Sequence, residues 1–86
     1  MIVERFRAGD AVPVYRRLRD HGRMAPDGLR YVDSWVSDDL TVCYQLMEGE
    51  RALLDAWIGN WSDLVDFEVV QVVASATARA RVAPRL

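Results

Sequence analysis

The stretch Leu29–Glu48, LRYVDSWVSDDLTVCYQLME, contains two runs rich in β-branched and aromatic residues on either side of an Asp-Asp pair. Such runs are typical of β-strands, and Asp38 and Asp39 tolerate the backbone angles of a tight turn. The stretch therefore predicts a β-hairpin. A turn with an even number of residues makes Tyr31 face Leu46, Asp33 face Tyr44, Trp35 face Val42, Val32 face Gln45, Ser34 face Cys43 and Val36 face Thr41.

The two faces of this hairpin differ in the size of their side chains. The bulky face carries Tyr31, Asp33, Trp35, Tyr44 and Leu46, and the other face carries Val32, Ser34, Val36, Cys43, Gln45 and Met47. Neither face is polar enough to lie in water, so each needs a covering layer. We expect helices against the smaller face. The bulky face then predicts a homodimer, in which a second copy of the same face covers it.

The rest of the chain supplies two further strands and three helices, each with its own sequence pattern. One strand shows an alternating residue pattern, and the other is rich in β-prone residues. Apolar residues at helical spacing mark two helices, and an Ala-rich run marks the third. The expected elements are a strand over Ile2–Phe6, a helix capped by Asp10 and ended by Gly22, a loop over Arg23–Gly28, a helix from Glu50 to about Trp61–Ser62, a strand over Phe67–Val73, and a short helix from Ser75 to Val82 that Pro84 stops.

The order of these elements, β-α-β-β-α-β, predicts an α+β fold of ferredoxin-like topology. Right-handed crossovers then require an antiparallel sheet with the strand order 4-1-3-2 and both helices on one face. We expect a single domain over residues 1–86, in which residues 1–73 form the core and residues 74–86 form a helical tail.

Composition narrows the class of protein. With 51% hydrophobic and 28% charged residues and a net charge of −2, the chain resembles soluble globular proteins and not a generally basic nucleic-acid binder. It has no apolar run long enough to cross a membrane, and Glu4 and Arg5 bring charge too early for a signal peptide, so we expect a cytoplasmic protein. The single cysteine excludes an internal disulfide and a Cys-rich metal site.

Five segments together resemble a known family: Val3–Phe6, Tyr15–Met24, Gly28–Trp35, Cys43–Glu48 and Trp57–Glu68. They are similar to a small bacterial family of single-domain proteins, known as a domain of unknown function and grouped with the dimeric α/β-barrel proteins. The resemblance extends to about Val73, and it implies two four-stranded sheets packed face to face with helices outside. The wider superfamily includes cofactor-free monooxygenases, haem-dependent enzymes, stress-induced dimers and ligand-sensing domains, so the fold does not choose an activity.

His21 and Cys43 are the residues whose side chains most often carry chemistry. His21, the only histidine, lies on the apolar stripe near the end of its helix. It is a candidate catalytic base or, more remotely, a haem ligand, although the helix dipole also favours an imidazole there. Cys43 lies within a strand without a basic neighbour, which favours an inert packing role over a reactive thiol. One histidine and one cysteine are too few for a metal site, and we expect no cofactor.

Glu4, Asp33 and Glu48 are acids in strands that should be covered. Buried acids need partners or have raised pKa values, so these residues are possible proton acceptors. The alternative is an ion pair with Arg5, Arg23 or Arg30, or exposure at a strand end, which is easiest for Glu48. Gln45 lies on the helix side, where its amide needs a partner from the backbone or from a ligand. Glu4 and Gln45 therefore join His21 as candidate catalytic residues.

The aromatic residues Tyr15, Trp57 and Trp61 either fill the core or line a pocket for a flat ligand. Aromatic walls with few polar groups are typical of small-molecule sites, so we take these three and Gln45 as candidate ligand-binding residues. The leading hypothesis is a homodimer that binds a small hydrophobic or aromatic molecule, with the oxygenase-like or isomerase-like chemistry that the resemblance implies. The alternative is a non-catalytic structural or regulatory dimerisation module. We expect neither nucleic-acid nor membrane partners.

Overall fold

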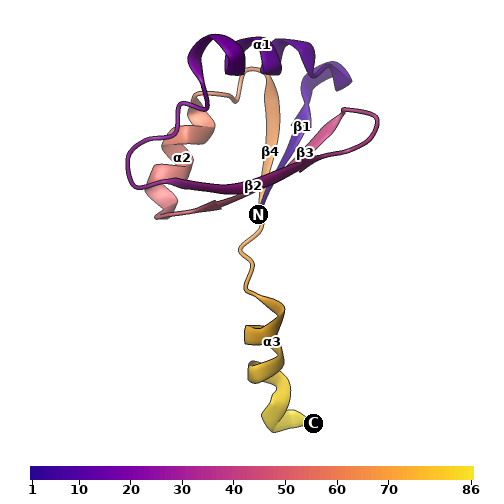
Figure 1. Cartoon of the computed structure of the whole chain (residues 1–86), viewed down its shortest axis with the longest axis vertical. Helices are drawn as coiled ribbons and strands as arrows, with labels where there is room; N and C mark the ends of the chain where they lie inside the picture. The colour runs from indigo at the N-terminus through magenta and orange to yellow at the C-terminus, as the bar shows by residue number, and fades with distance from the viewer.

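The computed structural model describes all residues from Met1 to Leu86 and contains one four-stranded sheet and three α-helices (Figure 1). The strands are β1 (Ile2–Phe6), β2 (Arg30–Val36), β3 (Val42–Glu48) and β4 (Val65–Val69). The α-helices are α1 (Val12–His21), α2 (Arg51–Gly59) and α3 (Ser75–Val82). Short 3-10 segments, η1 (Arg7–Gly9) and η2 (Ala83–Arg85), follow β1 and α3.

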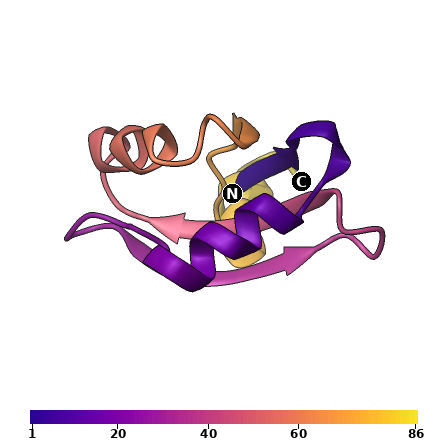
Figure 2. The same cartoon turned by 90° about the horizontal axis from the view of Figure 1, so that it is seen from above.

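The sheet has the strand order β2-β3-β1-β4, and every neighbouring pair is antiparallel. This is the predicted order read from the opposite edge, so the predicted α+β fold with ferredoxin-like topology is confirmed. Seen from above, α1 crosses over the strands and α2 lies to one side (Figure 2). Helix α3 extends away from the sheet at the end of an extended segment (Figure 1). None of the helices has the length and apolar character needed to cross a membrane.

Helix α1 begins and ends as its sequence predicts. The side chain of Asp10 accepts a hydrogen bond from the backbone N–H of Val12 at 3.0 Å, and Pro13 lies in the first turn, where its missing N–H costs nothing. At the other end Gly22 adopts a φ of 68° and donates its N–H to Leu18 at 2.9 Å. The helix is therefore held at both ends by local interactions.

The last strand differs from its prediction. It was expected over Phe67–Val73, but β4 runs from Val65 to Val69. Strand β1 is the only neighbour of β4. The two strands pair from Ile2, opposite Val69, to Phe6, opposite Val65, which uses the full length of β1. Beyond that, two hydrogen bonds join Val70 and Met1: the Val70 N–H donates to the Met1 oxygen at 2.8 Å, and the Met1 amino group donates to the Val70 oxygen at 2.7 Å. The length of the partner strand, and not the β propensity of the later valines, decides where β4 ends. Helix α2 also ends at Gly59, before the predicted Trp61–Ser62, and turns fill the remaining residues.

The predicted register of the hairpin is wrong by two residues along most of its length. Trp35 faces Tyr44, Ser34 faces Gln45 and Val36 faces Cys43. Leu40, and neither aspartate, has the positive φ of the turn, at 61°. A shift of two residues leaves every side chain on its own face because side chains alternate with a period of two. The predicted faces therefore survive the wrong register for these residues.

A β-bulge at Val32 corrects the prediction for Tyr31. The register shifts between Tyr31, which faces Met47, and Asp33, which faces Leu46, so Val32 is an extra residue in β2. A shift of one residue moves a side chain to the other face. Tyr31 therefore lies on the helix side and not on the bulky outer face, and Val32 is a partly exposed residue outside the helix-covered core.

The core lies between the helices and one face of the sheet. Trp57 of α2 is almost completely buried and packs edge-on against Phe67 of β4, with ring centroids 5.8 Å apart. It belongs to a cluster with Ile2, Leu29 and Trp61, and a second cluster contains Phe6, Cys43 and Val65. The opposite face of the sheet is open. There Trp35 and Tyr44 remain 52% and 43% exposed.

Candidate functional site

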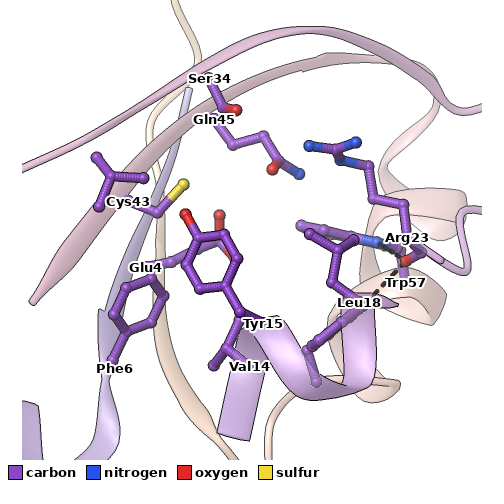
Figure 3. A pocket seen from close by; sticks show the side chains of 12 residues that line it. Glu4, Phe6, Val14, Tyr15, Leu18, Arg23, Ser34, Cys43, Gln45 and Trp57 are labelled. Carbon is purple, nitrogen blue, oxygen red and sulfur yellow. Dashed lines mark hydrogen bonds between the residues drawn. The ribbon is translucent and has the colours of Figure 1, made fainter. Parts of the chain in front are cut away.

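A cavity of about 180 Å³ lies between the helix-covered face of the sheet, α1 and α2 (Figure 3). Most of its wall is apolar, and four polar side chains of the strands and of the loop after α1 also reach it. The lining residues are Glu4, Phe6, Val14, Tyr15, Leu18, Arg23, Ser34, Val36, Cys43, Gln45, Trp57 and Trp61. The cavity therefore combines apolar walls with a few polar groups, as small-molecule sites do.

Glu4 is the polar residue at the floor of this cavity. It lies on β1, an inner strand, where alternation turns Ile2, Glu4 and Phe6 toward the helices. The residue is only 6% exposed, and its Oε2 atom has no hydrogen-bond partner. Burial raises the pKa of the Glu4 carboxyl to about 7, against the smaller opposing effects of the Cys43 thiol and the Arg23 charge. Glu4 can therefore hold or release a proton near neutral pH.

Cys43 faces Glu4 across the pairing of β1 and β3. Burial, and then the charge of Glu4, raises the pKa of the Cys43 thiol to about 12. A thiol with so high a pKa holds almost no thiolate at neutral pH, and the thiolate is the reactive form. This geometry supports a packing role for Cys43.

Tyr15 and Gln45 approach the cavity from different elements. The hydroxyl of Tyr15, on α1, points toward Glu4 and Cys43 (Figure 3). Burial, followed by the Cys43 and Glu4 charges, raises the pKa of this phenol, so it remains a neutral donor and acceptor. Gln45, on β3, is 5% exposed, and its amide donates only to the Met47 sulfur at 3.3 Å. Because thioether sulfur is a weak acceptor, the Gln45 amide retains capacity for a stronger partner.

Two tryptophans hold the loop that carries Arg23. Trp57 and Trp61 both donate their indole N–H to the backbone oxygen of Arg23, at 2.9 and 3.0 Å. Asn60 donates its side-chain amide to the next carbonyl, that of Met24, at 3.2 Å. Met24 has a φ of 58°, which a bulky residue keeps only when its surroundings impose it. The end of α2 thus determines where the loop lies.

The side chain of Arg23 reaches from this loop to the cavity. Its guanidinium carbon lies 3.6 Å from the centroid of the Tyr31 ring, a close cation–π contact. The Tyr31 hydroxyl is in turn 2.7 Å from the Ser34 hydroxyl. The Nε atom of Arg23 is buried and has no hydrogen-bond partner. From the sequence, Arg23 is a loop residue and one of three arginines that could pair with a strand acid. Its place at the cavity depends on the bulge after Tyr31 and on both indoles, which are contacts between segments far apart in the chain.

Five of the six residues chosen from the sequence as catalytic or ligand-binding candidates meet at this cavity: Glu4, Tyr15, Gln45, Trp57 and Trp61. His21 does not. It is exposed at the end of α1, beside a separate surface depression that Asp20 and two arginines also line. The apolar stripe of α1 therefore reaches the core through Val14 and Leu18 and ends before His21.

The other two acids of the strands lie away from the cavity. Glu48 is exposed at the open end of the hairpin and forms an ion pair with Arg30, as the alternative interpretation predicted. Asp33 is exposed on the outer face, where its carboxylate accepts a hydrogen bond from the backbone N–H of Ser34 at 2.8 Å. Of the three strand acids, Glu4 alone is buried.

Comparison with known proteins places the chain in one family. The family model described as Domain of unknown function (DUF3303) matches residues 1–86. No curated protein and no solved structure matches the chain. The match agrees with the resemblance to a small domain of unknown function, while the dimeric α/β-barrel superfamily remains a prediction. The chain belongs to the DUF3303 family.

Proposed function

We propose that this protein binds a small hydrophobic or aromatic molecule in the cavity under α1. The observation that carries the proposal is Glu4, a carboxyl that is 6% exposed, has an unpartnered oxygen and borders a cavity with mostly apolar walls. Buried polar groups in native proteins are nearly always hydrogen-bonded, and exceptions cluster at functional sites. A ligand that carries a polar group would give Glu4 its partner.

The size of the cavity restricts the ligand. Drug-sized sites usually exceed about 300 Å³, whereas this cavity measures about 180 Å³. An apolar cavity of roughly 150 Å³ is enough for benzene. The proposed ligand is therefore about the size of a single ring, held between Leu18 of α1 and Trp57 of α2.

The chemistry that this site supports best is proton transfer. With a pKa of about 7, Glu4 can take a proton from a bound molecule and keep it, which leaves an anion on the ligand. Return of that proton at another atom would be an isomerisation. Reaction of the same anion with dioxygen would be an oxygenation without a cofactor. Tyr15 and Gln45 lie where they could donate hydrogen bonds to the anion.

Native mass spectrometry of the protein isolated from its own host tests the binding proposal. We expect a small molecule that leaves the protein on denaturation and whose occupancy falls when Glu4 is replaced by Gln. Glu68→Gln is the matched control, because Glu68 is an exposed acid on the neighbouring strand and should leave the occupancy unchanged. A protein that carries no ligand, and whose Gln45 amide signals in NMR spectra do not move with any single-ring aromatic probe, whether hydrocarbon, phenol or aromatic acid, would contradict the proposal.

A second proposal concerns the open face of the sheet. Trp35 and Tyr44 face each other there, are about half exposed and have Leu46 beside them. Exposed apolar patches of this kind mark interaction surfaces. We propose that two copies pack these faces together in a dimeric α/β barrel. If the cavity binds no ligand, dimerisation itself would be the function, and the protein would be a structural or regulatory module.

A further inference from the structure

We propose that the ligand is a single-ring aromatic acid that also carries a hydroxyl group, a molecule of the hydroxybenzoate class. Its carboxylate would bind Arg23, its hydroxyl would bind Glu4, and its ring would contact the apolar walls between them. This inference deepens the proposed function and rests on it, because it specifies the molecule that the same cavity takes.

Two ionisable residues at one cavity each have a buried polar atom without a hydrogen-bond partner. Glu4 Oε2 and Arg23 Nε are the two buried side-chain polar atoms of the chain without a hydrogen bond. Six ion pairs form elsewhere with N–O distances of 4.0 Å or less, and neither residue takes part in any of them. An unpaired buried group costs free energy, and here two such groups of opposite charge border the same space.

The fold keeps Glu4 and Arg23 apart. The backbone oxygen of Arg23 is held by both indoles at 2.9 and 3.0 Å, and its guanidinium rests on the Tyr31 ring. Glu4 is fixed by its place on an inner strand. Figure 3 shows the two side chains on opposite sides of the cavity, with the Gln45 amide extending into the space between them. The arrangement keeps a cation and a carboxyl at a separation that a third group can bridge.

The two sides of the cavity, at Arg23 and at Glu4, recognise different chemical groups. A guanidinium presents a rigid fork of N–H donors that fits a carboxylate, and such bonds are among the strongest in proteins. When ionised, the Glu4 carboxylate only accepts hydrogen bonds, and when protonated it can also donate one; a hydroxyl can serve as its partner in either state. Between them, Leu18 and Trp57 offer apolar contact to a ring. A hydrocarbon would leave both charged groups unpaired, so the site should reject it in favour of a molecule with both groups.

Calorimetric titration of the full chain at neutral pH with matched probes tests this inference. The probes are toluene, p-cresol, 4-methylbenzoate and the three isomers of hydroxybenzoate. Because one hydrogen bond to a charged group is worth about tenfold or more in affinity, the best hydroxybenzoate should bind at least tenfold tighter than p-cresol and than 4-methylbenzoate.

Variants then assign each end of the ligand. Arg23→Gln should abolish the advantage of hydroxybenzoate over p-cresol, and Glu4→Met should abolish its advantage over 4-methylbenzoate. Arg19→Gln, which removes an exposed arginine paired with Asp20, is the control and should change neither ratio. Arg23→Lys and Glu4→Gln serve as milder variants should the first pair lose the native circular dichroism spectrum, and each should reduce the corresponding ratio.

The outcomes separate this inference from the proposed function. Toluene or p-cresol binding as tightly as every hydroxybenzoate would overturn the ligand class while small-molecule binding survives. Unchanged affinity ratios in the Arg23 variants would also overturn it. If no probe binds but the protein from its host retains another molecule, the class is wrong and the proposed function stands. If no probe binds and no molecule is retained, both fail.

Discussion

The stability of the fold depends on whether the Glu4 carboxyl is protonated. Its pKa is raised by burial from 4.5 to about 7, so the folded protein binds the Glu4 proton more tightly than the unfolded chain does. The stabilising effect of that proton is complete below about pH 4.5 and is lost as the pH rises through about 7. Arg23, Cys43 and Tyr15 face the carboxyl. The Cys43 thiol and, to a smaller extent, the positive Arg23 favour its ionised form, but burial outweighs both.

We therefore predict that the Glu4 contribution to the free energy of unfolding falls by about 3 kcal/mol between pH 4.5 and pH 8, since each pKa unit corresponds to ~1.4 kcal/mol. Glu4→Gln should remove this dependence and be the more stable protein at pH 8. Urea unfolding at a series of pH values measures the effect. Glu68→Gln, which changes an exposed acid, should follow the wild-type curve. A Glu4→Gln curve parallel to that of the wild type would refute the raised pKa.

At the scale of elements, the hairpin turn depends on one of its two aspartates. The Oδ1 atom of Asp39 accepts hydrogen bonds from the hydroxyls of Ser37 and Thr41, both at 2.7 Å, and from the N–H of Thr41 at 3.2 Å. Hydrogen bonds from Thr41, and then from Ser37, lower the pKa of the Asp39 carboxyl. Side chains that bond their own backbone in this way stabilise turns.

We predict that Asp39→Ala lowers the melting temperature at pH 7, whereas Asp38→Ala, which removes a neighbouring exposed aspartate without such bonds, does not. Because the pKa of Asp39 is lowered in the folded state, its contribution should be present at neutral pH and disappear as the pH falls through that pKa. Differential scanning calorimetry of both variants and of the wild type provides the comparison. Equal decreases in the melting temperature of the two variants would show that the turn does not depend specifically on Asp39.

At the scale of the whole molecule, the open face of the sheet predicts how copies associate. In the proposed dimer Trp35 lies against the partner's face, so Trp35→Glu would bury a charge without a partner. We expect the wild type to sediment as a dimer at micromolar concentration and the variant as a monomer. Val12→Glu changes an equally exposed apolar residue on α1 and should remain dimeric. A wild type that sediments as a monomer would rule out the dimer.

The tail should contribute little to the stability of the domain. Every residue of α3 is exposed, and the short η2 that follows it is the only element with which the helix makes more than marginal contact. A chain that ends at Ala74 should therefore unfold at the same temperature as the whole chain, as measured by circular dichroism. A clear decrease in the unfolding temperature would show that the tail packs against the domain or against a second copy. The stable core would then extend beyond residues 1–73.

The sequence alone determined the order of the elements, the order of the strands and the ends of α1. These features depend on local signals, such as the Asp10 cap, the left-handed Gly22 and the change between periods of two and of 3.6 residues. The faces of the hairpin were also predictable where its strands are regular, because a register error of two residues preserves each side chain's face. For this reason Gln45 was predictable as a helix-facing polar residue, whereas Glu4, on β1, was predictable only as an acid in a covered strand.

Only the tertiary structure decided the position of Tyr31, of His21 and of Arg23. The bulge at Val32 turns Tyr31 under the helices, and no local pattern announces it. The loop after α1 is placed by two indole N–H groups from residues 34 and 38 positions further along the chain, which converge on one carbonyl oxygen. Contacts between segments so far apart depend on the packing of the whole fold. Only in three dimensions does it become visible that the buried Glu4 carboxyl and the Arg23 guanidinium border one cavity without contacting each other.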